Sequence, residues 1–114
     1  MPKSDIVRAQ HMLEASTEIA SFVAGKTRAD LETDRMFVLA CTRLFEVIGE
    51  AAAQVSPEFK DLHSDIPWAK IIGMRNRLIH AYFDINLDVF WETLVSDIPS
   101  LIDTLKNILQ SQDS

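Results

Sequence analysis

Apolar residues recur at three- and four-residue steps along most of the chain, the spacing that lines one face of an α-helix. Ser4 or Asp5 is expected to cap a first helix that continues until Gly25, because glycine commonly ends helices. The apolar positions of this helix are Ile6, Met12, Leu13, Ile19, Phe22 and Val23. Thr27 and Asp30 then resemble a capping box and predict a short helical turn.

A longer helix is predicted to start at Thr33 or Asp34 and to end near Val55. Its apolar positions are Met36, Leu39, Ala40, Leu44, Val47, Ile48 and Ala51. Ser56-Pro57 places a capping residue before a proline at the first helical position, so a second short turn is expected there. That turn should end before Pro67.

Pro67 is expected to open the next helix, and Asn86 and Asp88 to begin the last one, with a kink at Pro99. The last helix carries Val89, Phe90, Leu94, Ile98, Leu101, Ile102, Leu105 and Ile108 on its apolar face. No alternating strand pattern, repeat or low-complexity linker interrupts the series. The sequence therefore predicts an all-α, up-and-down helical bundle with short extra helical turns, in one domain over residues 1–114.

Composition is ordinary for a folded globular chain, with 47% hydrophobic and 25% charged residues in 114 positions. The N-terminus has no apolar signal core, and the run Met36 to Cys41 is far too short to span a bilayer. We therefore expect a cytoplasmic protein without membrane contact. Cys41 is the only cysteine, which excludes an intrachain disulfide, and its apolar neighbours predict a buried, inert thiol.

The formal net charge of −6 argues against a broad basic surface for nucleic acid. Residues 66–83 differ from the rest, because they contain Lys70, Arg75 and Arg77 and no acidic residue. A small basic site of this kind could hold one or two phosphates, and a second copy of the chain would double it.

Arg75 occupies an unexpected position on the helix that Pro67 opens. On an ideal helix at about 100° per residue, apolar side chains lie within roughly 60° of it on both sides. These are Trp68, Ile71, Ile72, Leu78, Ile79 and Tyr82. A guanidinium in an apolar stripe needs a carboxylate, a phosphate or a wet groove between subunits. Glu46 and Glu50, one turn apart, are candidate partners, although they could equally form a solvated face beside Arg43.

The same geometry separates Arg75 from His80 by about 140°, whereas Asn76 and His80 share a face. A local distortion such as a π-bulge could bring the guanidinium and the imidazole together, or a second copy could complete the site. We favour a two-fold homodimer in which these helices face each other, because the groove between them would also solvate Arg75.

Residues 73–83, GMRNRLIHAYF, combine with IPW at 66–68 and IGEA at 48–51 into a specific pattern. The chain resembles, over nearly its whole length, the HepT-like branch of the HEPN superfamily (higher eukaryotes and prokaryotes nucleotide-binding). The central signature is an arginine, four residues, a histidine, one residue and a tyrosine, and the chain matches it without departure.

The resemblance implies an all-α homodimer that acts as the toxin of a type VII toxin–antitoxin pair and cuts RNA in a dimer cleft without a metal ion or cofactor. It also implies a partner, a minimal nucleotidyltransferase that neutralises the toxin by transferring AMP to the signature tyrosine. Carried over to this sequence, Arg75 and His80 are catalytic, Asn76 is the polar residue beside them, and Tyr82 is modified. Lys70 and Arg77 lie outside the signature, and a role for them in phosphate binding is our own inference.

Two other classes of function stay open at this point. The chain could be a non-catalytic adaptor that binds a nucleotide or substrate for a nucleotidyltransferase. It could also be a helical dimerisation module in which Arg75 only pairs with Glu46 or Glu50. His11 and His63 have no partners at metal-ligand spacing, so no metal site is predicted. Trp68 and Trp91 are expected to anchor packing.

Overall fold

The computed structural model describes residues 3–81 and 85–112, and all regular secondary structure within them is helical. The elements are α1 (Lys3–Val23), α2 (Asp30–Thr33), α3 (Arg35–Gln54), α4 (Pro57–Leu62), α5 (Trp68–Ala81), α6 (Leu87–Glu92), the π-helical turn η2 (Thr93–Asp97) and α7 (Ile98–Gln112). The all-α class and the two short turns at α2 and α4 are therefore confirmed for this part of the chain.

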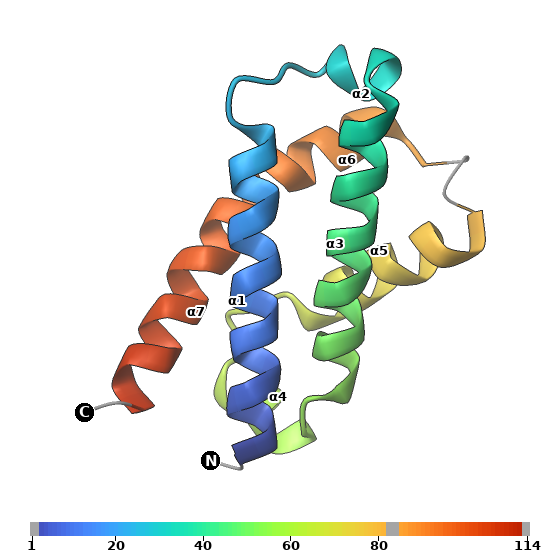
Figure 1. The fold of residues 1–114 in the computed structure, drawn as a ribbon. Helices are drawn as coiled ribbons and strands as arrows, with labels where there is room; N and C mark the ends of the chain where they lie inside the picture. Colours follow the sequence, from blue (N-terminus) through green and yellow to red (C-terminus); the bar gives the residue numbers. More distant parts are fainter. Residues whose placement is uncertain (1–2, 82–84, 113–114) are drawn as a thin grey trace.

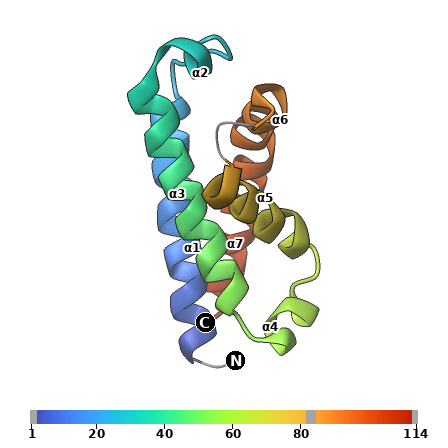
Figure 2. The ribbon, with the colours of Figure 1, turned by 90° about the vertical axis from the view of Figure 1, so that its right-hand side faces the viewer.

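The long helices form a bundle around α1. Helices α1 and α3 run antiparallel and pack against each other, and α7 packs against the other side of α1 (Figure 1). Helix α5 packs against α3 but crosses it instead of running alongside it, as the second view shows (Figure 2). The up-and-down arrangement thus holds for α1, α3 and α7, whereas α5, which carries the signature residues, lies across the bundle.

The core is made of apolar side chains contributed by every long helix. Fully buried members include Met12, Ile19, Ile48, Phe59, Leu78, Phe90, Leu94, Ile98 and Leu105. Each such side chain contributes roughly 1.5–3 kcal/mol when it leaves water. Five residues assigned to apolar faces from the sequence are exposed instead: Met36 at 82%, Val89 at 45%, Phe22 at 44%, Leu39 at 43% and Ile79 at 40%. On α3 the buried face is Phe37, Cys41, Phe45 and Ile48, because the helix is rotated from the predicted stripe.

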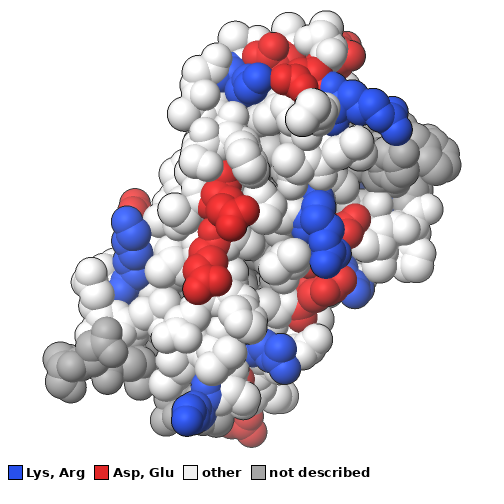
Figure 3. All heavy atoms as spheres, viewed as in Figure 1, with Lys and Arg blue, Asp and Glu red and all other residues white. Residues whose placement is uncertain are grey.

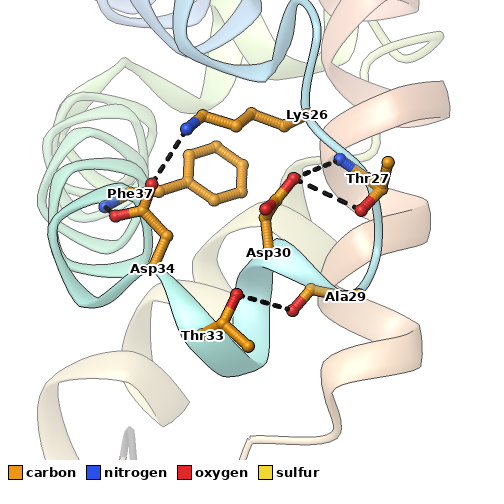
Figure 4. Close-up of polar contacts among 7 residues, drawn as sticks. All are labelled: Lys26, Thr27, Ala29, Asp30, Thr33, Asp34 and Phe37. Atoms are coloured by element: carbon orange, nitrogen blue, oxygen red, sulfur yellow. Dashed lines mark hydrogen bonds and ion pairs between the residues drawn. The ribbon is translucent and has the colours of Figure 1, made fainter.

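Short-range interactions between residues close in sequence stabilise the connection between α1 and α3 (Figure 4). Gly25 adopts a φ of 80°, a conformation that glycine accepts without steric cost, and α1 ends just before it. The Asp30 carboxylate accepts a hydrogen bond of 2.7 Å from the Thr27 backbone N–H. Asp34 caps α3 by accepting from the Phe37 N–H at 3.1 Å, and its other oxygen binds Lys26 Nζ at 2.8 Å. The predicted start of α3 at Asp34 is confirmed. Of the predicted capping box only the bond from the Thr27 N–H to Asp30 is present, because α2 begins at Asp30 and its N-cap is Ala29, which makes no side-chain cap.

The sequence predicted that Ser4 or Asp5 caps α1, which is wrong because the helix already begins at Lys3 and includes both residues; Asp5 has another role. Its carboxylate is 2% exposed and accepts hydrogen bonds from the Ser56 backbone N–H at 2.9 Å and from the Ser56 hydroxyl at 2.7 Å. The Ser56 Oγ in turn accepts from the Phe59 N–H at 3.1 Å and so caps α4. A buried carboxylate therefore ties the start of the chain to the start of α4.

The predicted kink near Pro99 takes the form of a π-helical turn. The turn η2 covers Thr93–Asp97 and ends two residues before the proline. Proline has no N–H to donate to the fourth residue before it, and its ring crowds that carbonyl. A widened turn accommodates both effects, and π turns are a known cause of such interruptions. Just upstream, Asn86 caps α6, as predicted, by accepting from the N–H groups of Asp88 and Val89.

No helix within residues 3–81 and 85–112 is both long enough and apolar enough to cross a membrane. This finding agrees with the composition.

Candidate active site on α5

Arg75 lies where α5 crosses α3, and its side chain is 26% exposed. Its neighbours on the inner face of α5, Ile71, Met74 and Leu78, are buried in the core. The aliphatic stem rests on the backbone of α3 at Gly49, because a Cβ at that position would overlap Cβ and Cγ of Arg75. Gly49 is thus the residue that lets the two helices approach closely enough for the arginine to pass between them.

The guanidinium lies between a polar side chain of α5 and an acidic side chain of α3. Nη1 donates to the Asn76 side-chain oxygen at 2.9 Å, and Nη2 lies 3.9 Å from Oε1 of Glu50. Nε is buried and has no hydrogen-bond partner among the residues that the structure describes. Glu46, the other candidate partner, instead lies 3.4 Å from Arg43 on its own helix. Of the two glutamates, the structure places Glu50 at the arginine.

His80 lies in the last turn of α5, exposed, as are Asn76 and Arg77. Helix α5 is a regular α-helix from Trp68 to Ala81, so a π-bulge within the signature is ruled out there. The five-residue separation therefore keeps Arg75 and His80 about 140° apart around the helix axis. Within one protomer, the cation and the imidazole point in different directions.

The remaining predicted site residues have different surroundings. Lys70 Nζ lies 2.7 Å from Asp97 in η2, so its charge already has an acidic partner. Arg77 is exposed on the outer face of α5. Tyr82, the residue assigned to modification, lies outside the described residues. Of the predicted set, the structure thus brings Arg75, Asn76 and Glu50 together.

A mainly apolar pocket lies on another side of α5, where η2 and α7 meet it. Its lining residues are Phe45, Asp65, Ile66, Pro67, Lys70, Ile71, Met74, Thr93, Asp97, Ile98, Ser100, Leu101 and Thr104. None of Arg75, Asn76 and His80 contributes to it. The signature residues therefore belong to an open surface of α5 and not to this pocket.

The other residues singled out in the sequence have structural roles. Trp68 donates a hydrogen bond from its indole nitrogen to the His63 carbonyl at 3.0 Å. The ring of Phe59 packs against the indole of Trp68 and the imidazole of His63. Cys41 is buried, as predicted, and burial raises the pKa of its thiol to about 11, which favours the protonated form at neutral pH. Among the described residues, no three acidic, histidine or cysteine side chains converge in a way that could hold a metal ion.

Charges of both signs are interspersed over the face of the molecule seen in Figure 3. On the face seen in Figure 3, acidic side chains gather over α1 at the centre and basic ones are scattered around them. This distribution agrees with the net charge of −6. No broad basic surface is therefore seen on this face.

Gly49 belongs to the site, although no role was predicted for it from the sequence, where it forms part of the IGEA segment. A glycine inside a strong helical pattern costs about 1 kcal/mol relative to alanine, so it usually has a packing or functional reason. That local signal could have pointed to a close helix crossing. The partner at the crossing, Arg75, lies 26 positions further along and could not be named from it.

Residues 12–108 match the family model described as HepT-like, "Ribonuclease HepT-like". The chain is 38% identical over 103 residues to "Putative RNase TTE0752" of Caldanaerobacter subterraneus subsp. tengcongensis, covering 90% of this chain and 92% of that protein. It is 39% identical over 97 residues to "Probable ribonuclease HepT" of Thermococcus cleftensis, covering 85% and 83%. No solved structure is significantly similar to the chain. The match over most of its length, together with the signature on α5, shows that this chain belongs to the HepT-like ribonuclease family.

Proposed function

We propose that the chain is an endoribonuclease that cleaves RNA without a metal ion and that works as a two-fold homodimer. The observation that carries the proposal is the placement of Arg75 in a member of a ribonuclease family. Its stem packs on Gly49 and its guanidinium lies between Glu50 and Asn76, while 26% of the side chain is exposed. A cation held in place at an open surface is suited to bind a phosphate.

A second copy of the chain would complete the site. Because Arg75 and His80 of one α5 point in different directions, two facing α5 helices would let the arginine of one protomer and the histidine of the other reach the same phosphate. The outer surface of α5 is open to such a partner, since Ile79 is 40% exposed and no atom lies within 4 Å of a Cβ built at Gly73. Light scattering should then give twice the mass of the chain.

The residue types fit metal-free cleavage. A base must take the proton of the ribose 2′-hydroxyl, an acid must protonate the leaving 5′-oxygen, and a cation must stabilise the charged phosphorane. Two His80 imidazoles, one from each protomer, can supply the base and the acid, because an imidazole can take up a proton and an imidazolium can give one up. Arg75 can bind two phosphate oxygens through parallel N–H donors, and Asn76 can orient the phosphate or the imidazole. The products are 2′,3′-cyclic phosphates and free 5′-hydroxyls.

Cleavage of a labelled RNA tests the proposal. Arg75→Met keeps the stem that packs on Gly49 but removes the guanidinium, and His80→Ala removes the imidazole; each should lower cleavage at least 100-fold. Arg43→Met, which removes an exposed arginine on α3, should leave cleavage within about two-fold. Products with only 5′-phosphate ends, or activity that disappears with a chelator, would refute the mechanism.

We further propose that a minimal nucleotidyltransferase neutralises the chain by transferring AMP to Tyr82. The support is the signature, in which Tyr82 follows His80 by two residues. An added nucleotide would place a bulky anion beside the surface that receives the RNA phosphate, so charge and volume would both block it. Mass spectrometry after co-expression with the cognate transferase should find the adduct on Tyr82. An unmodified chain, or an adduct elsewhere, would contradict this step.

A second candidate function is a non-catalytic adaptor that binds a nucleotide or substrate for that transferase. The acidic net charge of −6 and the Glu50 carboxylate near Arg75 favour it. His80→Ala distinguishes the two functions. Loss of RNA cleavage and of growth inhibition together supports the nuclease, whereas a change in partner binding alone supports the adaptor.

A further inference from the structure

Arg75 has little freedom in its aliphatic part. Because a Cβ at Gly49 would overlap Cβ and Cγ of Arg75 and lie 3.5 Å from its Cδ, the stem runs directly over the α3 backbone. Nε is buried at the end of this stem. The rotamers of the first three side-chain carbons are therefore fixed by packing, and only the guanidinium plane is left to be oriented.

Two polar groups flank that plane on different helices. Asn76 is the next residue on α5 and moves with Arg75, so its hydrogen bond at 2.9 Å cannot fix the guanidinium relative to α3. Glu50 lies on α3, directly after Gly49, with its Oε1 3.9 Å from Nη2. Its carboxylate is the acidic group within salt-bridge distance of Arg75 among the described residues.

The buried Nε lacks a partner within residues 3–81 and 85–112, which indicates that this arrangement is not optimised for stability. A buried N–H without a partner costs about 1–3 kcal/mol, and an apolar side chain of similar length would avoid the cost. The arginine is nevertheless held there, with its exposed edge beside the open face of α5. A functional demand on the position of the guanidinium accounts for this better than a structural one.

We propose that Glu50 is a positioning residue, which acts through Arg75 by holding its guanidinium at the edge of α5 in the orientation that receives the scissile phosphate. This inference rests on the proposed ribonuclease function. An arginine fixed before substrate arrives loses less conformational freedom on binding a phosphate than one that is free to turn. Glu50 therefore contributes to the rate of the step whose transition state Arg75 stabilises.

The matched control is Glu46, which carries the same charge on the same helix, one turn earlier, and pairs with Arg43. Glu50→Gln and Glu46→Gln remove the same charge from α3, so a general electrostatic effect on RNA binding should be equal in both. A positioning effect should appear only in Glu50→Gln.

Steady-state cleavage separates the two effects. Glu50→Gln should lower kcat by about three- to ten-fold, the cost of ordering one free side chain, without raising KM. Glu46→Gln should leave kcat within two-fold. In an Arg75→Met background, adding Glu50→Gln should change the affinity for a 2′-O-methyl RNA no more than adding Glu46→Gln does. An equal loss of kcat in both single variants, or a specific Glu50 effect that persists without Arg75, would overturn the proposal.

A readout without RNA tests the positioning itself. The side-chain Nε–H signal of Arg75 in a ¹⁵N spectrum, identified by its loss in Arg75→Met, should be protected from solvent exchange because Nε is buried. Glu50→Gln should speed its exchange at least several-fold, and Glu46→Gln should not. If exchange is faster only in Glu50→Gln but the wild type cleaves no RNA, the proposed function fails, whereas the role of Glu50 in holding Arg75 stands. If Glu50→Gln leaves the exchange unchanged, the positioning role fails whatever the activity.

Discussion

Replacing Gly49 by alanine tests the packing on which the site depends. The added Cβ would overlap Cβ and Cγ of Arg75. Because the position of a Cβ is set by the backbone, no rotamer change at Arg75 removes the overlap. Carbon atoms need roughly 3.5–4 Å between them, so α3 and α5 must move apart by at least about 1 Å at the crossing.

The expected magnitude follows from two opposing contributions. Overpacking of a tight contact costs typically about 1–3 kcal/mol, and a rigid backbone contact belongs at the upper end of that range. Replacing a helical glycine by alanine returns about 1 kcal/mol. We therefore expect Gly49→Ala to lower the free energy of unfolding by roughly 2 kcal/mol, or Tm by about 8 °C for a chain of this size.

Urea and thermal unfolding followed by circular dichroism measure this change. Gly73→Ala is the matched control, since Gly73 is also on a helix but no atom lies within 4 Å of a Cβ built there. It should raise stability by up to about 1 kcal/mol. A Gly49→Ala protein as stable as the wild type, or stabilised as much as Gly73→Ala, would refute the close crossing of α3 and α5 and the placement of Arg75 derived from it.

Three other predictions concern residues away from the site. Asp5→Ala should cost about 2–4 kcal/mol in urea unfolding, because it removes a buried carboxylate that accepts two hydrogen bonds from Ser56; a loss under 0.5 kcal/mol would contradict that role. The hydrogen bond from Lys26 lowers the pKa of Asp34 in the folded state, so its stabilisation is complete above the unfolded pKa near 4 and is lost as the pH falls through the lower folded value. Asp34→Asn should abolish this part of the acid sensitivity (Figure 4), and an unchanged pH profile of unfolding would count against it. The Cys41 thiol, with its pKa raised to about 11 by burial, should react with Ellman's reagent only on unfolding in urea, and fast labelling of the native protein would show that it is accessible.

The sequence by itself determined several of the points at which helices begin or end. Gly25, Asp34, Ser56 and Asn86 act on backbone groups no more than four residues away, so their effects could be predicted without a tertiary model. It also determined that one helix places Arg75 within an apolar stripe, because helical periodicity is a local property. The family signature is likewise read from a short stretch of sequence, Arg75 to Tyr82.

Only the tertiary structure decided which distant groups meet. From helical periodicity, Glu46 and Glu50 were equally good candidates for the partner of Arg75. Glu50 is the partner because of the point at which α5 crosses α3. Asp5 looked like a cap until the fold placed it beside Ser56, and Met36 looked buried until the rotation of α3 exposed it. Crossing points and rotations are set by the fit of whole helix surfaces. Here the crossing depends on Gly49 of α3, where the absence of a side chain leaves room for the stem of Arg75.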